Sequence, residues 1–146
     1  MGRQDSFATV PEKALATGPD RMIGITFDAG GLIALDRNDR RVLALVARAA
    51  ERGSRITIPA TALAQAMRSP SRQARLSRLT RQPGSDVVAL NAPDATAVGL
   101  LLASTGTADI VDAHVVVCAR RAGQTIVTSD PADLQRIAPE ATLVAI

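Results

Sequence analysis

The stretch Ile25-Thr-Phe-Asp-Ala-Gly-Gly-Leu-Ile-Ala-Leu35 decides the fold of this chain of 146 residues. An apolar run ends at Asp28, a small turn made of Ala29, Gly30 and Gly31 follows, and a second apolar run then begins. This pattern is typical of a buried β-strand that leads directly into a helix. We therefore predict a strand that ends at Asp28 and a helix that begins after the turn.

The same alternation of strand and helix continues to the C-terminus. Short apolar runs bounded by turn residues predict further strands, and apolar residues spaced three and four apart predict the helices between them. The expected strands lie at 56–58, 86–90, 125–128 and 142–146, and the expected helices include 39–52, 60–68, 71–82 and 93–104. A further helix of roughly 13 residues, which Thr107 can cap, is expected to end before Gly123, and a short helix begins at Asp130. Such an order predicts an α/β fold with a parallel sheet covered by helices on both faces.

We expect one domain over residues 22–146, because a chain of this length suits a single hydrophobic core. Residues 1–21 show no clear periodicity and contain Pro11, Gly18 and Pro19, so we predict a flexible N-terminal extension there. An arm that docks on the domain or on a partner is the alternative. No apolar run approaches the roughly 18 residues that cross a bilayer. We therefore expect a cytoplasmic protein without a membrane partner.

The basic residues are almost all arginines, and the single lysine, Lys13, precedes the domain. Between Arg40 and Asp86 ten arginines face only two acids, which gives a local net charge of +8 against +3 for the whole chain. A basic middle segment suggests a polyanionic partner such as nucleic acid, although proteins that bind nothing charged also carry such surfaces. A stripe of arginines at helical spacing predicts either a track for RNA phosphates or a solvated face: Arg68, Arg72, Arg75, Arg78 and Arg81.

Two acids three residues apart, Asp109 and Asp112, stand before a run of valines. On a helix they share one face. Asp109 lies near the expected helix start, where the helix dipole favours a negative charge, so a capping role explains it. Asp112 lies one turn deeper in an apolar segment, where an unpaired carboxylate is costly, so it requires an arginine or a metal ion.

Two expected strands end at or close to an acid, Asp28 and Asp130, and the carboxyl ends of parallel strands share one edge of the sheet. Together with Asp112 they would form a cluster of like charges that a divalent ion neutralises. Carboxylates suit Mg²⁺ or Mn²⁺, which activate water and stabilise charge on a phosphoryl group. The cluster therefore points to phosphodiester hydrolysis.

Several other functions are excluded by what the sequence lacks. No phosphate-binding glycine motif or P-loop lysine is present, and phosphatases that pair an aspartate nucleophile with a lysine need a lysine inside the domain. The single histidine, His114, cannot support a two-histidine ribonuclease mechanism and is expected in the core. The single cysteine, Cys118, allows neither an intramolecular disulfide nor a cysteine-based zinc site and is expected as a small buried residue.

Four motifs in this order resemble the PIN-domain nucleases, in particular the VapC-type toxins of bacterial toxin–antitoxin systems. They are Ile-Thr-Phe-Asp28-Ala-Gly-Gly, Ile-Pro-Ala-Thr-Ala-Leu-Ala-Gln65, Asp109-Ile-Val-Asp112-Ala-His and Ile-Val-Thr-Ser-Asp130-Pro-Ala-Asp133. The resemblance spans residues 22–146. It implies a three-layer α/β/α fold with four or five parallel strands, a homodimer, Mg²⁺-dependent endoribonuclease activity through metal-activated water, and inhibition by a small antitoxin protein.

The resemblance also implies roles for individual residues. Asp28 and Asp112 match the principal metal ligands, Asp130 an acid that supports a water or a second ion, and Asp109 a further acid of the catalytic group. Gln65 stands where the family usually carries a glutamate that binds the metal or orients the water, and an amide has no negative charge. Two alternatives therefore stay open: a PIN-like module with weakened catalysis that binds RNA or an antitoxin, and a nuclease that cuts DNA.

Overall fold

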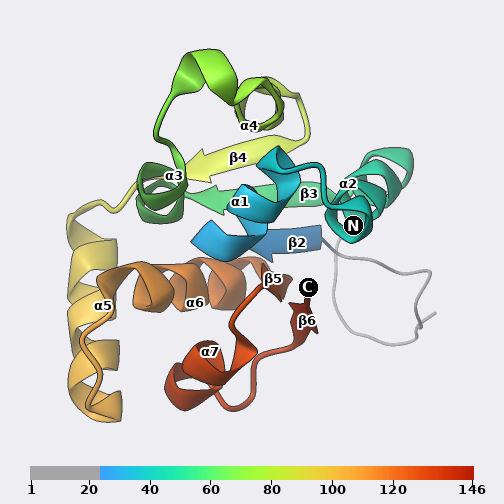
Figure 1. Ribbon diagram of the computed structural model, residues 1–146. Coiled ribbons are helices and arrows are strands. Elements are labelled where there is room, and N and C mark those ends of the chain that lie inside the picture. The colour runs from blue at the N-terminus through green and yellow to red at the C-terminus, as the bar shows by residue number, and fades with distance from the viewer. Residues whose placement is uncertain (1–23) are drawn as a thin grey trace.

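The computed structural model describes residues 24–146, so the expected N-terminal extension at 1–21 lies outside the described residues (Figure 1). At its centre is a five-stranded sheet with the order β4-β3-β2-β5-β6, in which all neighbouring strands are parallel. The strands are β2 (Gly24–Phe27), β3 (Arg55–Pro59), β4 (Ser85–Val88), β5 (Thr125–Thr128) and β6 (Leu143–Ala145). The predicted α/β fold with a parallel sheet is confirmed.

Helices connect each strand to the next. They are α1 (Ala29–Asp36), α2 (Arg40–Glu51), α3 (Ala60–Ala66), the 3₁₀-helix η1 (Pro70–Arg72), α4 (Ala74–Arg81), α5 (Ala92–Thr105), α6 (Ile110–Ala122) and α7 (Pro131–Ile137). The chain moves along the sheet in one direction from β2 to β4 and in the opposite direction from β5 to β6. Because crossovers between parallel strands are right-handed, helices α1–α4 cover one face and α5–α7 the other.

The turn between β2 and α1 depends on its glycines. A Cβ atom at Gly31 would lie 2.7 Å from the carbonyl oxygen of Val127, and one at Gly30 would lie 1.9 Å from the hydroxyl oxygen of Ser129. Only residues without a side chain allow α1 to begin this close to the end of β5. The sequence that ends β2 therefore also sets how closely β2, α1 and the β5–α7 connection approach one another.

Helix α6 forms the centre of its layer and contacts β2, β3 and β5. It has 13 residues, which is the predicted length. His114 and Cys118 are buried in it, as expected, and the His114 Nδ1 atom lies 2.7 Å from the hydroxyl oxygen of Thr61 on α3. Burial lowers the pKa of His114. This histidine therefore helps to join α6 to α3 and is not offered to a substrate.

Three boundaries differ from the sequence prediction. Helix α3 ends at Ala66, and the helix expected at 71–82 is divided into η1 and α4. The Gln73 amide explains the break, because its oxygen accepts hydrogen bonds from the backbone of Arg68 and Ser69 and its nitrogen donates to the Ala66 carbonyl. The N-cap of α6 is Asp109, whereas Thr107 was expected in that position.

Within residues 24–146 no single helix is long and apolar enough to cross a membrane. Helices α5 and α6 reach the required length and composition only as a pair, and they are bent by 111° at the break between them.

Candidate active site

Asp28 lies at the carboxyl end of the central strand β2 and is buried, with 6% of its surface exposed. Its Oδ1 atom accepts a 2.7 Å hydrogen bond from the backbone nitrogen of Gly31 and so caps α1. The Thr128 hydroxyl donates a second hydrogen bond to this carboxylate. Burial nevertheless raises the pKa of Asp28, and the nearby charge of Asp130 adds to this effect. The fold therefore fixes the direction of a carboxylate whose charge is poorly solvated.

Asp130 follows β5, the neighbour of β2, so the two predicted strand-end acids lie on the same edge of the sheet. The backbone nitrogen of Asp130 donates a 2.9 Å hydrogen bond to the Thr128 hydroxyl oxygen. The pKa of Asp130 is raised, mainly through a hydrogen bond with the Asp133 carboxylate and also through the repulsion between these two acids. Thr128 therefore contacts both strand-end acids.

Asp109 and Asp112 approach the same edge from the start of α6. Asp109 Oδ1 accepts a 2.9 Å hydrogen bond from the Asp112 backbone nitrogen, which confirms the capping role inferred from the sequence. The pKa of Asp112 is raised to about 6, first by burial and then by the charges of Asp109, Asp28, Asp133 and Asp130. The structure thus brings the four predicted acids within electrostatic reach of one another.

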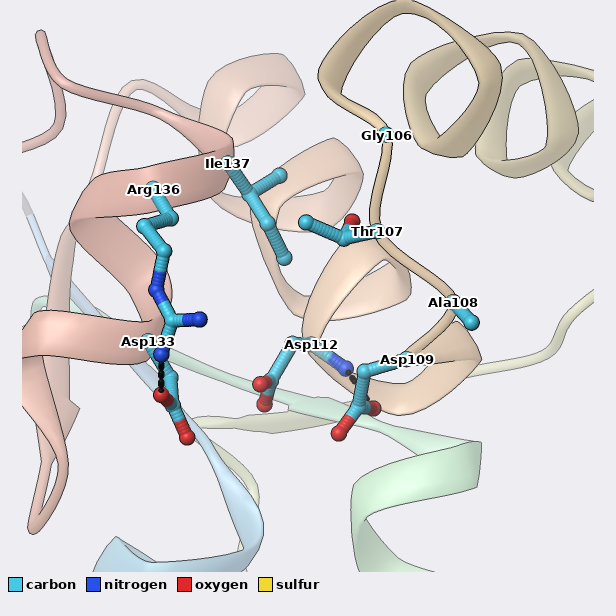
Figure 2. Close-up of a pocket in the computed structure, with 8 residues that line it drawn as sticks. All are labelled: Gly106, Thr107, Ala108, Asp109, Asp112, Asp133, Arg136 and Ile137. Carbon is cyan, nitrogen blue, oxygen red and sulfur yellow. Dashed lines mark hydrogen bonds and ion pairs between the residues drawn. The ribbon is translucent and has the colours of Figure 1, made fainter.

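A cavity of about 300 Å³ opens beside these acids, between the start of α6 and helix α7 (Figure 2). Asp133, Asp112 and Asp109 stand side by side at it with their carboxylates toward the same open side. Asp133 was not among the residues predicted for the site, although it belongs to the quoted Asp130-Pro-Ala-Asp133 motif. Its spacing of three residues from Asp130 at the start of a helix was the available signal.

Gln65 lies on the exposed side of α3, the helix that is joined to α6 through the contact between Thr61 and His114. The acids of the site lie on other elements, at the ends of β2 and β5 and at the start of α6. The structure therefore places Gln65 on a separate element that packs against α6.

The arginine stripe is exposed but does not form one helical face. Arg75, Arg78 and Arg81 lie on α4 opposite the buried Leu76 and Leu79, and Arg72 lies in η1. Arg68 follows α3 and folds back to donate hydrogen bonds to the carbonyl oxygens of Ala64 and Met67. The prediction of one continuous cationic helix face is therefore wrong, because the chain breaks at Gln73 and Arg68 caps the end of α3.

Residues 25–139 match the PIN domain family. This chain belongs to the PIN domain family. The matched segment begins in β2 and runs past α7, so it contains every acid of the candidate site. The four motifs quoted from the sequence all lie within the matched segment.

Two solved structures are similar to this PIN domain in fold. VapBC2 from Rickettsia felis, solved bound to a DNA fragment from their promoter, matches with a TM-score of 0.60 and 16% identity over 84% of this chain and 98% of the other. FitAB bound to an IR36 DNA fragment matches with a TM-score of 0.57 and 11% identity over 83% and 94% of the two chains. A comparison with curated protein sequences gives no match. At these identities the likeness concerns the fold.

PIN domains typically use divalent metal ions, and the acids of this chain suit such an ion in their chemistry. Their oxygen atoms are hard ligands, and the charges of neighbouring carboxylates raise the pKa values of Asp28 and Asp112. A divalent cation between Asp28 and Asp112 would remove this repulsion. Among residues 24–146, however, no three acidic, histidine or cysteine side chains lie close enough to make a preformed metal cluster. The donor atoms suit the ion by their chemistry, although no cluster for it is preformed in this part of the chain.

Proposed function

We propose that this PIN domain is a Mg²⁺- or Mn²⁺-dependent endoribonuclease, the toxin of a toxin–antitoxin pair. The observation that supports the proposal most directly is the convergence of Asp28, Asp109 and Asp130 on Asp112, whose pKa is raised to about 6. A structural role does not require four carboxylates at the edge of a sheet, because unneutralised like charges oppose one another. A divalent ion that acts on a phosphodiester requires such a group.

The residues of the candidate site have different roles in this proposal. Asp28 and Asp112 would hold the ion, and Asp130 would support a water or a second ion. When bound, the ion would supply an activated water and neutralise charge on the phosphoryl group. Thr128 keeps the Asp28 carboxylate directed by its hydrogen bond, and Gly31 does so from the backbone. The arginines of η1 and α4 would bind RNA phosphates.

The direct experiment is cleavage of labelled RNA by the purified chain with Mg²⁺ or Mn²⁺, compared with Asp28→Asn and Asp112→Asn. Both variants keep the side-chain shape and lose a charged ligand, so we expect wild-type cleavage and none from either variant. Glu51→Gln, on the exposed end of α2, is the matched control and should cleave as wild type does. Equal behaviour of the wild type and both site variants would show that the acids do not catalyse cleavage.

Two alternatives remain and can be separated in the same assay. A PIN domain that lacks catalysis because of Gln65 would bind RNA and leave it intact. A DNA nuclease would cut single- or double-stranded DNA at least as fast as RNA of the same sequence. We favour RNA because the family resemblance of the motifs implies it.

The partners that we propose follow from the relatives and from one surface of the chain. The similar solved structures are VapBC2 and FitAB complexes, so we propose a small antitoxin protein as the partner of this chain. We also propose a homodimer through α5. That helix buries only Asp94 and Val98, exposes 68% of Leu100, and has no charged residue on its outer side. A neutral apolar face suits a second copy of a chain with net positive charge.

A further inference from the structure

The cavity beside the acids has two unlike walls. The segment from Gly106 to Asp109 and the first turn of α6 provide one wall, and Asp133, Arg136 and Ile137 of α7 provide the other. Figure 2 shows Arg136 on α7 with its guanidinium reaching toward the Asp133 carboxylate. Of the eight residues that line the cavity, Arg136 is the only basic one. The cavity therefore offers one cation among three acids.

Arg136 is held only loosely in its present position. Its guanidinium forms an ion pair with Asp133 three residues earlier, and 70% of the Arg136 side chain is exposed. An exposed pair of this kind contributes less than about 1 kcal/mol, because water screens it and two long side chains must be ordered. Since guanidinium carries five donors in a planar fork, most of its donors remain available to an anion.

We infer that Arg136 binds an RNA phosphate next to the one that is cleaved, in the cavity between α6 and α7. This inference rests on the proposed nuclease function and deepens it, because it assigns the position of the substrate backbone at the same site. The cavity volume of about 300 Å³ is at the lower end for small-molecule sites, which fits one phosphate with its sugar. The Thr107 side chain lines the same space, and its hydroxyl is hydrogen-bonded to the Thr105 hydroxyl at 3.1 Å.

The charges that line the cavity explain why the phosphate would bind together with the ion and not without it. Asp109, Asp112 and Asp133 repel an anion, and one arginine does not balance three carboxylates. A divalent ion bound at Asp112 would lower this repulsion. The donors of the Arg136 guanidinium that Asp133 does not use are then available to the phosphate, for which the fork geometry of guanidinium is suited.

A purely structural role for Arg136 makes a different prediction. An ion pair between residues three apart on a helix adds only about 0.2–0.5 kcal/mol to the helix. If that is the only function of Arg136, replacing it changes the stability slightly and leaves RNA binding as it was. Binding of RNA therefore distinguishes the two roles.

The test is the affinity of a labelled single-stranded RNA, followed by fluorescence anisotropy with Ca²⁺ between about 50 and 200 mM salt. Ca²⁺ takes the same kind of oxygen ligands as Mg²⁺, so the acids keep an ion while the RNA is spared the cleavage that Mg²⁺ would support. We expect Arg136→Ala to raise Kd about 10- to 100-fold, as expected for one lost hydrogen bond to a charged group. The slope of log K against log salt should fall by about 0.7, which corresponds to one phosphate contact on a single strand.

Two controls make the result specific. Arg120→Ala removes an ion-paired arginine whose side chain is 47% exposed, at the opposite end of α6, where Arg120 contacts Glu140. It should leave both the Kd and the salt slope unchanged. Arg136→Ala also frees the charge of Asp133, which could repel RNA by itself. We therefore repeat the comparison in chains that all carry Asp133→Asn. In these chains a direct contact of Arg136 with the phosphate still predicts a loss of RNA affinity on Arg136→Ala, whereas release of the Asp133 charge predicts none.

The outcomes separate this inference from the proposed function. An unchanged Kd and slope for Arg136→Ala, in a chain that binds and cleaves RNA, overturn the phosphate site alone. A wild-type chain that neither binds nor cleaves RNA overturns both the phosphate site and the proposed function. An equal loss of affinity for RNA and for DNA of the same sequence supports the contact, because the proposed ligand is the phosphate that both share.

Discussion

Thr128 and Asp28 are joined by a hydrogen bond across two neighbouring strands, from the threonine hydroxyl to the carboxylate. The same hydroxyl oxygen accepts the backbone N–H of Asp130 at 2.9 Å. Thr128 is completely buried, so neither bond can be replaced easily by water. One hydroxyl thus positions a proposed metal ligand and the start of the segment that carries a second acid.

Replacing Thr128 by valine should weaken the site while the fold persists. Loss of a group that orients a metal ligand typically costs 10- to 100-fold in metal affinity or activity, and we expect about this range for Mg²⁺ binding and RNA cleavage. Since the hydrogen bond favours the charged form of Asp28, its loss should also raise the pKa of Asp28 further. The pH profile of cleavage should therefore move to higher pH.

Thr26→Val is the matched control for this variant. Thr26 is an equally buried threonine on β2, and its hydroxyl donates a 2.8 Å hydrogen bond to the Gln124 side chain, away from the acids. It should lower the stability and leave the pH profile where it was. If both valine variants keep wild-type metal affinity, the hydroxyl of Thr128 has no positioning role.

The raised pKa of Asp112 predicts how metal binding depends on pH. A metal ligand must be deprotonated, and Asp112 gains its proton near pH 6 in the free protein. The affinity for Mg²⁺ or Mn²⁺ should be constant above about pH 7 and fall up to about tenfold per pH unit below 6. Calorimetric titration at several pH values measures this. An affinity that stays constant down to pH 5 would show that Asp112 does not bind the ion.

The same shift predicts that Asp112→Asn stabilises the metal-free protein. An acid whose pKa is raised by folding costs stability above its unfolded pKa of 3.8, and the full cost is reached above about pH 6. Because Asp112 is only half-buried, we expect a gain of about 1 kcal/mol at pH 7 and almost none at pH 4. Thermal unfolding with a chelator measures it. Added Mg²⁺ should raise the Tm of the wild type and not that of the variant.

The sequence was sufficient for those parts of the fold that depend on local patterns. Apolar runs that end in Asp28 and near Asp130 predicted the two central strands, and the arginines and Gly123 at the end of α6 predicted its 13 residues against the strand preference of its valines. The convergence of the acids followed from one further rule, that parallel strands end at the same edge of a sheet.

Contacts between distant segments could not be predicted in this way. The bond between Thr128 and Asp28 joins residues 100 positions apart and requires that β5 lie next to β2. Asp133 becomes part of the site only because α7 packs against α6. The break at Gln73 depends on an amide that bonds a preceding loop, and helical spacing alone gives no sign of it.

Gln65→Glu tests whether the missing charge on α3 limits the activity. A carboxylate at this exposed position adds a negative charge to the helix that packs against α6 and would attract the proposed cation, so we expect tighter Mg²⁺ binding and faster RNA cleavage, each about 3- to 10-fold. Ala64→Glu adds the same charge at the preceding exposed position of α3, which points in another direction, and should have little effect. Cleavage by Gln65→Glu alone would assign the weakened alternative to the wild type. Equal cleavage by the wild type, Gln65→Glu and Ala64→Glu would mean that the other acids of the site suffice for activity.

The outer face of α5 predicts a dimer that two substitutions should affect in different ways. Leu100→Glu places a charge on the apolar face and should give a monomer, whereas Ala47→Glu, on the exposed side of α2, should not change the mass of the particle in solution.

A Cβ at Gly99 meets nothing within 4 Å in this chain, so Gly99→Ala should stabilise the monomer by up to about 1 kcal/mol. A partner helix packed closely against Gly99 would be pushed away by that methyl group, so the same variant should weaken the dimer. Light scattering after size exclusion measures the mass, and a wild-type chain that stays monomeric at every concentration would rule out this interface.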